Sequence, residues 1–191
     1  MKRKIYRTRR LILRPFILSD FSKWKKAHEI AAPAQDKFDL NPLPAERCTK
    51  YEFKELLMRQ RRNEKADRLY VWNVFLRKTG AYIGRIDIAT IIREPYEMAN
   101  LGYYIINIYC GKGYAKEALK KLIPAGLHDL KFHRLEAIID TDNFVSIKVA
   151  KKVGLYREGI KKHYWFQNKR WEDQVAFIAT PELFNSRIKA P

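Results

Sequence analysis

The chain has 191 residues, of which 47% are hydrophobic, so it can bury a substantial core, which argues against disorder. It carries 39 lysines and arginines against 21 acidic residues, a net charge of +18 that favours nucleic acid, acidic proteins or a phosphorylated cofactor without choosing among them. Because no apolar run reaches about 18 residues, we expect no membrane span.

Cysteine content and the start of the chain bear on its compartment. Cys48 and Cys110 lie far apart in unlike contexts, so the sequence predicts neither a disulfide framework nor a metal site, which fits a reducing cytoplasm. The basic residues 1–7 precede Leu11–Phe16, which is too short and too charged for a signal-peptide core. No repeat, low-complexity tract or Gly/Ser linker occurs, so we expect a single domain over residues 1–191.

The first predicted elements are a strand and a helix. Thr8–Phe16 is typical of an opening strand. Residues 19–30 predict a helix with Ser19 or Asp20 as its cap and Pro33 as a stop. One face of this helix would carry Phe21, Trp24, Ala27 and His28.

A second helix and three strands follow. Thr49 and Glu52 form a capping-box pattern ahead of an apolar helical face that contains Phe53, Leu56 and Leu57. Leu69–Leu76 and Ala81–Ile92 predict a buried hairpin with its turn at residues 78–80. Asn100–Ile106 continues the antiparallel run.

The last third alternates helices and strands. A helix begins near Ala115, and Pro124 and Gly126 should kink or end it. Arg134–Asp140 predicts a strand parallel to the one before that helix. A short helix over Ser146–Val153, stopped by Gly154, precedes a final hairpin of Ile160–Phe166 and Gln174–Ala179 that turns through Asn168. The elements predict a mixed α/β (α+β) fold with a mostly antiparallel central sheet and helices on both faces.

The segment YCGKGYAKEAL, Tyr109–Leu119, places two glycines directly before a helix. The unpaired N–H groups and the dipole at a helix start attract phosphate, and glycine lets it approach closely. An ordinary tight turn explains the same residues. The familiar nucleotide loops fit less well, because Lys112 is followed by Gly113 rather than Ser or Thr, and Lys116 stands where a dinucleotide fingerprint has glycine.

The longer segment YYIINIYCGKGYAKEAL, Tyr103–Leu119, resembles the cofactor-binding segment of the GNAT superfamily of N-acetyltransferases, and in particular its RimJ/RimL branch, which acetylates N-terminal amines of ribosomal proteins. The superfamily pattern Gln/Arg-x-x-Gly-x-Gly/Ala falls on Cys110, Gly113 and Ala115. A second motif, DNFVSIKVAKKVGL, is similar to the branch's Asn-x-x-Ser followed by Lys-x-Gly-Phe. The opening RTRRLILRPF and the strand YIGRIDI also resemble this branch, so the resemblance covers nearly the whole chain.

The resemblance implies acetyl-CoA as cofactor and a GNAT acyl-CoA acyltransferase fold with splayed central strands. The pyrophosphate would lie on the backbone amides of the glycine segment. Backbone groups near Ile105 and Ile106, left unpaired by the splay, would bind the pantetheine arm and stabilise the oxyanion. The cofactor-binding residues implied are Ile105, Ile106, Cys110, Gly111, Lys112, Gly113, Tyr114, Ala115, Asn143 and Ser146.

Catalytic roles are implied for Ile105, as oxyanion donor, and Ser146, as the acid that protonates the departing thiolate. Asn143 would bind the pantetheine arm, although Asn143 or Ser146 could equally be a helix cap. Direct attack of the amine in a ternary complex requires no nucleophile at Cys110. Relatives often carry Glu where this chain has Asn100, which leaves no base at the usual position.

The predicted function is acetyl transfer to a primary amine, most specifically an N-terminal α-amine of an acidic protein or peptide such as a ribosomal protein. The alternatives are a small-amine (aminoglycoside or polyamine) acetyltransferase and a basic nucleic-acid- or ribosome-binding protein without catalysis. The basic surface leaves nucleic-acid contact open, and the enzyme would be a monomer or homodimer. We expect His28, His133 and the clusters at residues 59–62 and 161–163 to be structural or solvated, while Tyr164, Trp165 and Trp171 could line an acceptor pocket or pack elsewhere.

Overall fold

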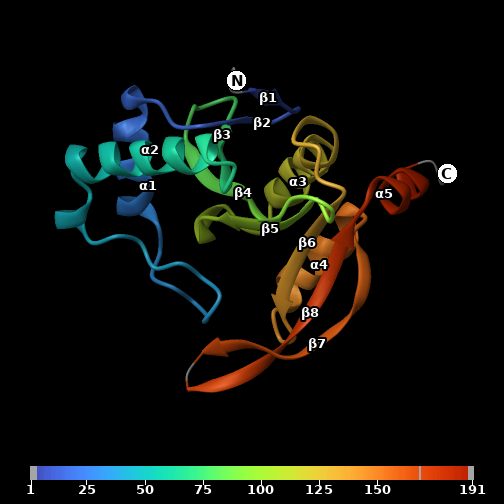
Figure 1. The fold of residues 1–191 in the computed structure, drawn as a ribbon. Coiled ribbons are helices and arrows are strands. Elements are labelled where there is room, and N and C mark those ends of the chain that lie inside the picture. The colour runs from blue at the N-terminus through green and yellow to red at the C-terminus, as the bar shows by residue number, and fades with distance from the viewer. Residues whose placement is uncertain (1–3, 168, 189–191) are drawn as a thin grey trace. The chain divides into compact units, whose positions relative to one another are not determined.

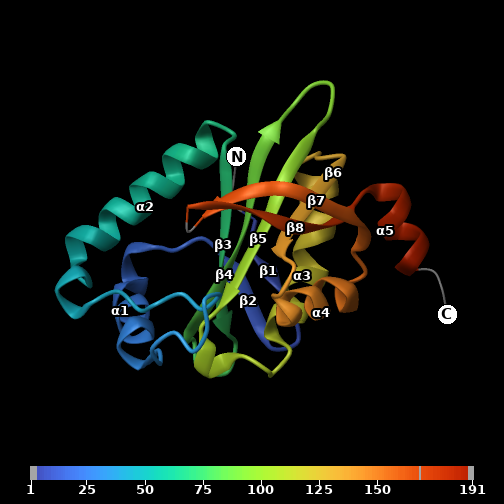
Figure 2. The ribbon, with the colours of Figure 1, turned by 90° about the horizontal axis from the view of Figure 1, so that it is seen from below.

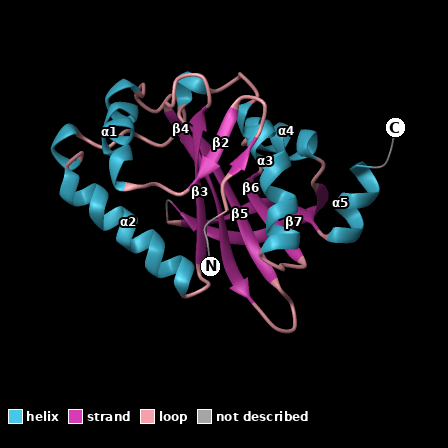
Figure 3. Ribbon diagram, turned by 90° about the horizontal axis from the view of Figure 1, so that it is seen from above, coloured by secondary structure: helices cyan, strands magenta, loops and turns pink. Residues whose placement is uncertain are grey.

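The structure is a computed structural model that describes residues 4–167 and 169–188. In this part of the chain there are eight β-strands and five α-helices (Figures 1 and 3). None of the helices described is long and apolar enough to cross a membrane. The elements are β1 Tyr6–Arg7, β2 Leu11–Arg14, α1 Phe21–Ile30, α2 Lys50–Lys65, β3 Leu69–Leu76, β4 Tyr82–Ile92, β5 Met98–Ile105, α3 Tyr114–Pro124, β6 Arg134–Asp140, α4 Phe144–Val153, β7 Tyr156–Gln167, β8 Arg170–Ala179 and α5 Pro181–Ile188.

The strands form one sheet in the order β1-β2-β3-β4-β5-β6-β8-β7. The pair β5–β6 is parallel, whereas β1–β2, β2–β3, β6–β8 and β7–β8 are antiparallel. The predicted mixed, mostly antiparallel sheet is therefore confirmed, including the parallel strand after the central helix.

The described residues belong to two compact units. The first unit draws on Met1–Asp87 and Tyr103–Lys121, and the second on Ile88–Gly102 and Leu122–Pro191. The prediction of one domain over residues 1–191 stays a prediction.

The core of the first unit is aromatic. The ring of Phe16 lies 5.2 Å from that of Phe53 and 4.8 Å from that of Tyr82, measured between centroids, and Trp24 lies 5.2 Å from Phe53. Trp24 belongs to α1 and Phe53 to α2, which lie side by side in Figures 1 and 2. Edge-to-face and tilted ring pairs of this kind add to the stabilisation that burial provides.

The caps of the first two helices differ from each other. Thr49 Oγ1 accepts from the Glu52 N–H at 3.1 Å, which confirms the predicted start of α2. Of the two predicted caps of α1, Ser19 and Asp20, Asp20 stands at the N-cap position, but its side chain makes no capping hydrogen bond. Its fully buried carboxylate instead accepts from Arg14 at 2.6 and 2.7 Å and from Lys23 at 3.1 Å. Because these bonds hold the carboxylate, it does not accept from the N–H groups of the first turn of α1.

The opening strand is shorter than predicted and has a partner. Within Thr8–Phe16, only Leu11–Arg14 is a strand, and it pairs with the two-residue strand Tyr6–Arg7. The intervening residues turn because the Thr8 N–H donates to the Leu11 carbonyl at 3.0 Å. This turn presents Arg10 to the glycine segment, where Arg10 contacts Lys112.

The central helix changes character at its proline. The α-helical part ends at Pro124, and a π-helical turn, Ala125–Asp129, follows. Proline lacks an N–H and crowds the preceding turn, so the predicted interruption is found there.

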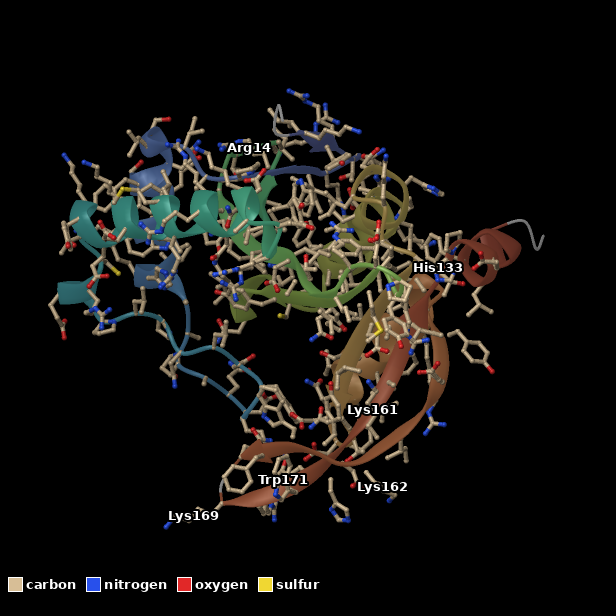
Figure 4. All side chains as sticks on the ribbon, in the orientation of Figure 1. Arg14, His133, Lys161, Lys162, Lys169 and Trp171 are labelled. Carbon is tan, nitrogen blue, oxygen red and sulfur yellow. The ribbon has the colours of Figure 1, made fainter. Side chains whose placement is uncertain are left out.

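In the second unit, β6 pairs with β8 from Leu135 and Ala179 to Asp140 and Gln174. The β7–β8 hairpin begins earlier than predicted, and its predicted turn residue, Asn168, lies outside the described residues. Figure 4 shows Lys169 and Trp171 at the end of this hairpin. The helix α5 has no counterpart among the predicted elements.

Candidate active site

The glycine segment lies in the first unit, between β5 and α3. After β5 the chain makes one 3-10 turn, Asn107–Tyr109, in which the Tyr109 N–H donates to the Ile106 carbonyl at 2.8 Å. Cys110–Gly113 then leads into α3, whose first backbone bond runs from the Glu117 N–H to the Gly113 carbonyl at 3.1 Å. The preceding N–H groups of the first helical turn have no partner within the helix.

Backbone conformation explains both glycines. Gly111 has φ +74° and Gly113 has φ +76°, values that residues with a Cβ rarely adopt. A Cβ at Gly111 would meet no protein atom within 4 Å, and one at Gly113 would meet only Arg10 Nη2, at 3.6 Å. The loop is therefore open on its outer side, and its amides and glycines fit the pyrophosphate of acetyl-CoA.

Arg10 and Glu117 hold this loop against the N-terminal segment. The Arg10 N–H donates to Glu117 Oε1 at 2.8 Å, and Arg10 Nε donates to Oε2 at 2.6 Å. Thr8 Oγ1 also donates to Oε1 at 2.6 Å, and Arg10 Nη1 donates to the Lys112 carbonyl at 3.0 Å. Burial raises the pKa of Glu117, but the bonds from Thr8 and Arg10 outweigh it and lower the pKa overall. Sequence reasoning missed this brace, because its members are more than a hundred positions apart.

Lys112 and Cys110 are held by the preceding turn. Lys112 Nζ donates to the Ile108 carbonyl at 3.0 Å, so the predicted contact of Lys112 with the cofactor stays a prediction. The Cys110 thiol donates to the Ile105 carbonyl at 3.4 Å, measured from Sγ. Burial raises the pKa of the Cys110 thiol, and the negative charges of Asp39 and Asp36 raise it further. The thiol is therefore protonated at neutral pH, which agrees with a mechanism without a cysteine nucleophile.

The end of β5 is fixed by a glycine of β4. The Ile106 N–H donates to the Ile83 carbonyl at 2.9 Å. A Cβ at Gly84, which has φ +153°, would lie 2.2 Å from the Tyr104 carbonyl oxygen and 2.9 Å from Ile105 Cα. Only glycine permits this approach, so the backbone at Tyr104 and Ile105 owes its position to Gly84.

Ile106 differs from its prediction. Its N–H bonds to Ile83 and its carbonyl accepts from Tyr109, so the expectation of unpaired backbone groups at Ile106 is wrong. The reason is that the chain turns directly after β5 and pairs these groups locally. Successive N–H groups of a strand point to opposite edges, so the Ile105 N–H points away from β4. The oxyanion role of Ile105 stays a prediction.

A cavity of about 330 Å³ opens in the first unit beside the end of β5. Phe16, Trp24, Tyr82 and Tyr104 form aromatic parts of its wall, and Tyr104 directly precedes Ile105. Burial raises the pKa of Tyr104 to about 12 and moves that of Tyr82 in the same direction. Both phenols are therefore neutral at physiological pH and act as donors rather than bases.

His28, for which the sequence predicts a structural role, also lines the cavity. Its Nδ1 accepts from the Leu43 N–H at 3.2 Å, so in the neutral ring the proton lies on Nε2. Burial lowers the pKa of His28, which keeps it neutral. Without a free imidazole lone pair, His28 is a poor base for a strongly basic amine.

Polar residues from α2 and β3 complete the wall. Arg59 and Gln60 belong to the cluster at residues 59–62, for which the sequence predicts a solvated face rather than a site, yet both line the cavity and Gln60 is buried. The expectation is wrong for Gln60, because the apolar periodicity of α2 does not mark it, whereas Arg59 is exposed at the cavity wall. Asn73, on β3, is 1% exposed and also faces the cavity. Among the buried side-chain nitrogen and oxygen atoms of the described residues, Asn73 Nδ2 is the one that has no hydrogen-bond partner.

The second unit contains Asn143 and Ser146. Asn143 Oδ1 accepts from the Ser146 N–H at 3.0 Å, so Asn143 caps α4 and Ser146 is its third residue. Of the two possible caps, Asn143 is the one observed at the start of α4. Gly154, with φ +92°, ends the helix as predicted. The roles of Asn143 and Ser146 toward the cofactor stay predictions.

The aromatic residues of the last hairpin are exposed. Tyr164 is 41%, Trp165 54% and Trp171 59% exposed, and the Trp171 ring lies 5.3 Å from that of Phe166. Within the second unit they lie on the surface of β7 and β8 rather than in its core.

Among the described residues, no group of three or more His, Cys, Asp or Glu could hold a metal ion.

Comparison with known proteins identifies the family. Residues 10–156 match the model of the acetyltransferase (GNAT) domain, so the chain belongs to the GNAT family and is an N-acetyltransferase with acetyl-CoA as donor. It is 35% identical over 124 residues to the probable N-acetyltransferase YjcK of Bacillus subtilis (strain 168). The aligned residues cover 64% of this chain and 68% of YjcK. Family membership favours the enzyme over a nucleic-acid-binding protein without catalysis.

Two solved structures share the fold. RimJ of Mycobacterium smegmatis, in complex with CoA-disulfide, has a TM-score of 0.74 at 21% identity and covers 93% of this chain and 87% of its own. Ribosomal-protein-S5-alanine acetyltransferase of Vibrio fischeri has a TM-score of 0.73 at 21% identity and covers 93% of this chain and 96% of its own. At this identity the similarity establishes the GNAT fold alone.

Proposed function

We propose that the acetyl acceptor is the N-terminal α-amine of an acidic protein or peptide, as in the RimJ/RimL branch, with ribosomal proteins as the leading class. The observation that carries the proposal is the cavity beside the end of β5. Its titratable lining includes two neutral phenols and a neutral histidine whose lone pair is engaged. Such a lining is matched to an amine that already loses its proton near neutral pH.

The amine's own chemistry supports this choice. An α-amine has a pKa of about 7.7–8.0, so a sizeable fraction is neutral at physiological pH, whereas a lysine amine, near pKa 10.4, needs a stronger base. Glu52 also lines the cavity, but its Oε1 accepts from Arg47 Nε at 2.9 Å. Asn100, which stands where relatives often carry Glu, cannot remove a proton.

Charge supports an acidic partner. The net charge of +18 raises the rate of encounter with an acidic protein and would disfavour a polyamine or aminoglycoside.

The chain's own residues would divide the work as follows. The amides of residues 111–115 and the start of α3 would bind the pyrophosphate, with the Arg10–Glu117 brace fixing the loop. The Ile105 N–H would donate to the developing oxyanion, and the Ser146 hydroxyl would give up a proton as the sulfur departs. Asn143 would bind the pantetheine arm. Bound acetyl-CoA supplies the acetyl group as an activated thioester.

The experiment compares acidic and basic peptides, each with free and acetyl-blocked N-termini, and spermidine as a small amine. Thiol release is measured across an ionic-strength series. We expect the free acidic peptide to be preferred and its advantage to shrink as salt shortens the screening length. Preference for basic peptides or spermidine, or undiminished activity on blocked peptides, would contradict the proposal.

A further inference from the structure

The buried amide of Asn73 has a donor that the protein does not use. Asn73 lies on β3, is 1% exposed and lines the cavity, and its Nδ2 has no partner among the described residues. Leaving a buried donor unsatisfied is costly, and native proteins keep very few such groups without a reason. An acceptor atom on a ligand in the cavity would remove this cost.

The charges around the cavity select the kind of acceptor atom. Of its three arginines, Arg47 is paired with Glu52 at 2.9 Å, and Arg85 is paired with Asp87 at 3.2 Å. Arg59, exposed on α2 at the cavity wall, has no ion-pair partner in the described part of the chain. One unmatched cation and one unmatched amide donor therefore share the cavity.

We infer that the cavity binds the acetyl acceptor through a carboxylate, with Asn73 and Arg59 as the residues that determine this specificity. The inference rests on the proposed acetylation of an amine and names its substrate class: an amine whose own residue bears a carboxylate. A carboxylate offers oxygen acceptors to the Asn73 amide and a negative charge to the guanidinium, and charge-assisted bonds of this type are the stronger ones.

The size and place of the cavity agree with this class. A volume of about 330 Å³ is at the small end of the range for ligand sites, which suits one residue rather than a large ligand. Tyr104 belongs to the cavity wall and is the neighbour of Ile105, so a residue held here has its amine close to the end of β5. The carboxylate has two sources, an acidic side chain of a peptide's first residue and the α-carboxylate of a free amino acid.

The test measures kcat and KM on peptides that begin with Asp or with Asn and are otherwise identical, and on free and amidated aspartate. Wild type should favour the Asp peptide over the Asn peptide by about 10-fold in kcat/KM, the ratio expected for a hydrogen bond to a charged group. If the α-carboxylate of a free amino acid is the source, kcat/KM should instead be higher for free aspartate than for aspartate whose α-carboxyl is amidated. Asn73→Leu and Arg59→Gln should each remove most of the preference through KM, with acetyl-CoA affinity unchanged.

Stability separates recognition from a structural role. Asn73→Leu removes an unsatisfied buried donor, so its melting temperature should equal or exceed that of wild type. The matched controls are Asn63→Leu and Arg61→Gln, both on α2 and outside the cavity wall, and they should keep the wild-type preference. A lower melting temperature with an unchanged preference in Asn73→Leu would mean that a buried water or the fold uses the amide, and would overturn the inference.

The two proposals fail differently. If no α-amine is acetylated and another amine is, the proposed function is wrong. If α-amines are acetylated but Asp and Asn peptides react equally in wild type, and free aspartate does not exceed its amide, the function stands and the carboxylate inference is wrong.

Discussion

Arg10 and Glu117, which are 107 positions apart, are joined by two hydrogen bonds, from the Arg10 N–H and from its Nε to the two oxygens of one carboxylate. Arg10 also bonds the Lys112 carbonyl, and its guanidinium lies 4.6 Å from the centroid of the Tyr114 ring. The brace therefore joins the middle of the glycine turn to the first turn of α3. We regard it as the device that preorganises the predicted pyrophosphate site.

Glu117→Gln should weaken this brace. The amide keeps an acceptor oxygen but loses the charge, so CoA should bind several-fold more weakly. The free energy of unfolding should fall by on the order of 1 kcal/mol or less, because Arg10 is 36% exposed and solvent screens the pair. The pKa of Glu117 is lowered in the folded state, so its stabilisation is present above the ordinary value of 4.5 and is lost as pH falls through the folded value. Calorimetry with CoA and denaturant unfolding measure both effects. Glu55→Gln, on α2, serves as control, and unchanged CoA affinity in Glu117→Gln would contradict the role of the brace.

Gly113→Asp should abolish measurable CoA binding. The substitution places a Cβ at φ +76° and a negative charge where the pyrophosphate is predicted to lie. Gly159→Asp adds the same side chain on β7, where a Cβ meets no atom within 4 Å, and should leave CoA affinity unchanged. If calorimetry gives the wild-type affinity for Gly113→Asp, the assignment of the loop is wrong.

Ser146→Ala should lower kcat by about 10- to 100-fold while CoA affinity is kept, if the hydroxyl is the proton donor. The effect is modest because a thiol of pKa about 8.5 already leaves readily. Asn143→Ala should instead lower stability by about 1 kcal/mol, since it removes the cap of α4. Equal turnover in a folded Ser146→Ala variant would leave Ser146 without a catalytic role.

The pH profile should follow the acceptor rather than the enzyme. For a peptide with a free α-amine, kcat/KM should rise with pH to a plateau with an apparent pKa of about 8, because the neutral amine is the reactant. The raised pKa of Tyr104, about 12, keeps its phenol protonated across this range, so no falling limb should come from it. Full activity at pH 6 would contradict this expectation, because it would require an enzyme group that is deprotonated at that pH and takes the proton from the bound amine.

The sequence by itself determined the local structure and the class of chemistry. Leu69–Leu76 and Arg134–Asp140 are strands with the predicted bounds, because both are rich in apolar and β-branched residues. The glycine segment lies before a helix as predicted, since φ values of +74° and +76° are a property that Gly111 and Gly113 carry locally. The resemblance to GNAT enzymes rests mainly on this glycine segment and on the second motif, DNFVSIKVAKKVGL.

Only the tertiary structure decided which residues serve the site from a distance. Asn73 reads as an ordinary polar residue in an apolar strand until the fold buries it against a cavity without a partner. Gly84 is required because the Tyr104 carbonyl of the neighbouring strand leaves no room for a Cβ, and the Asp20 carboxylate binds the Arg14 guanidinium instead of capping α1. Propensities and caps act over a few residues along the chain, whereas these contacts depend on strand register and on how the helices pack, and no local pattern encodes those.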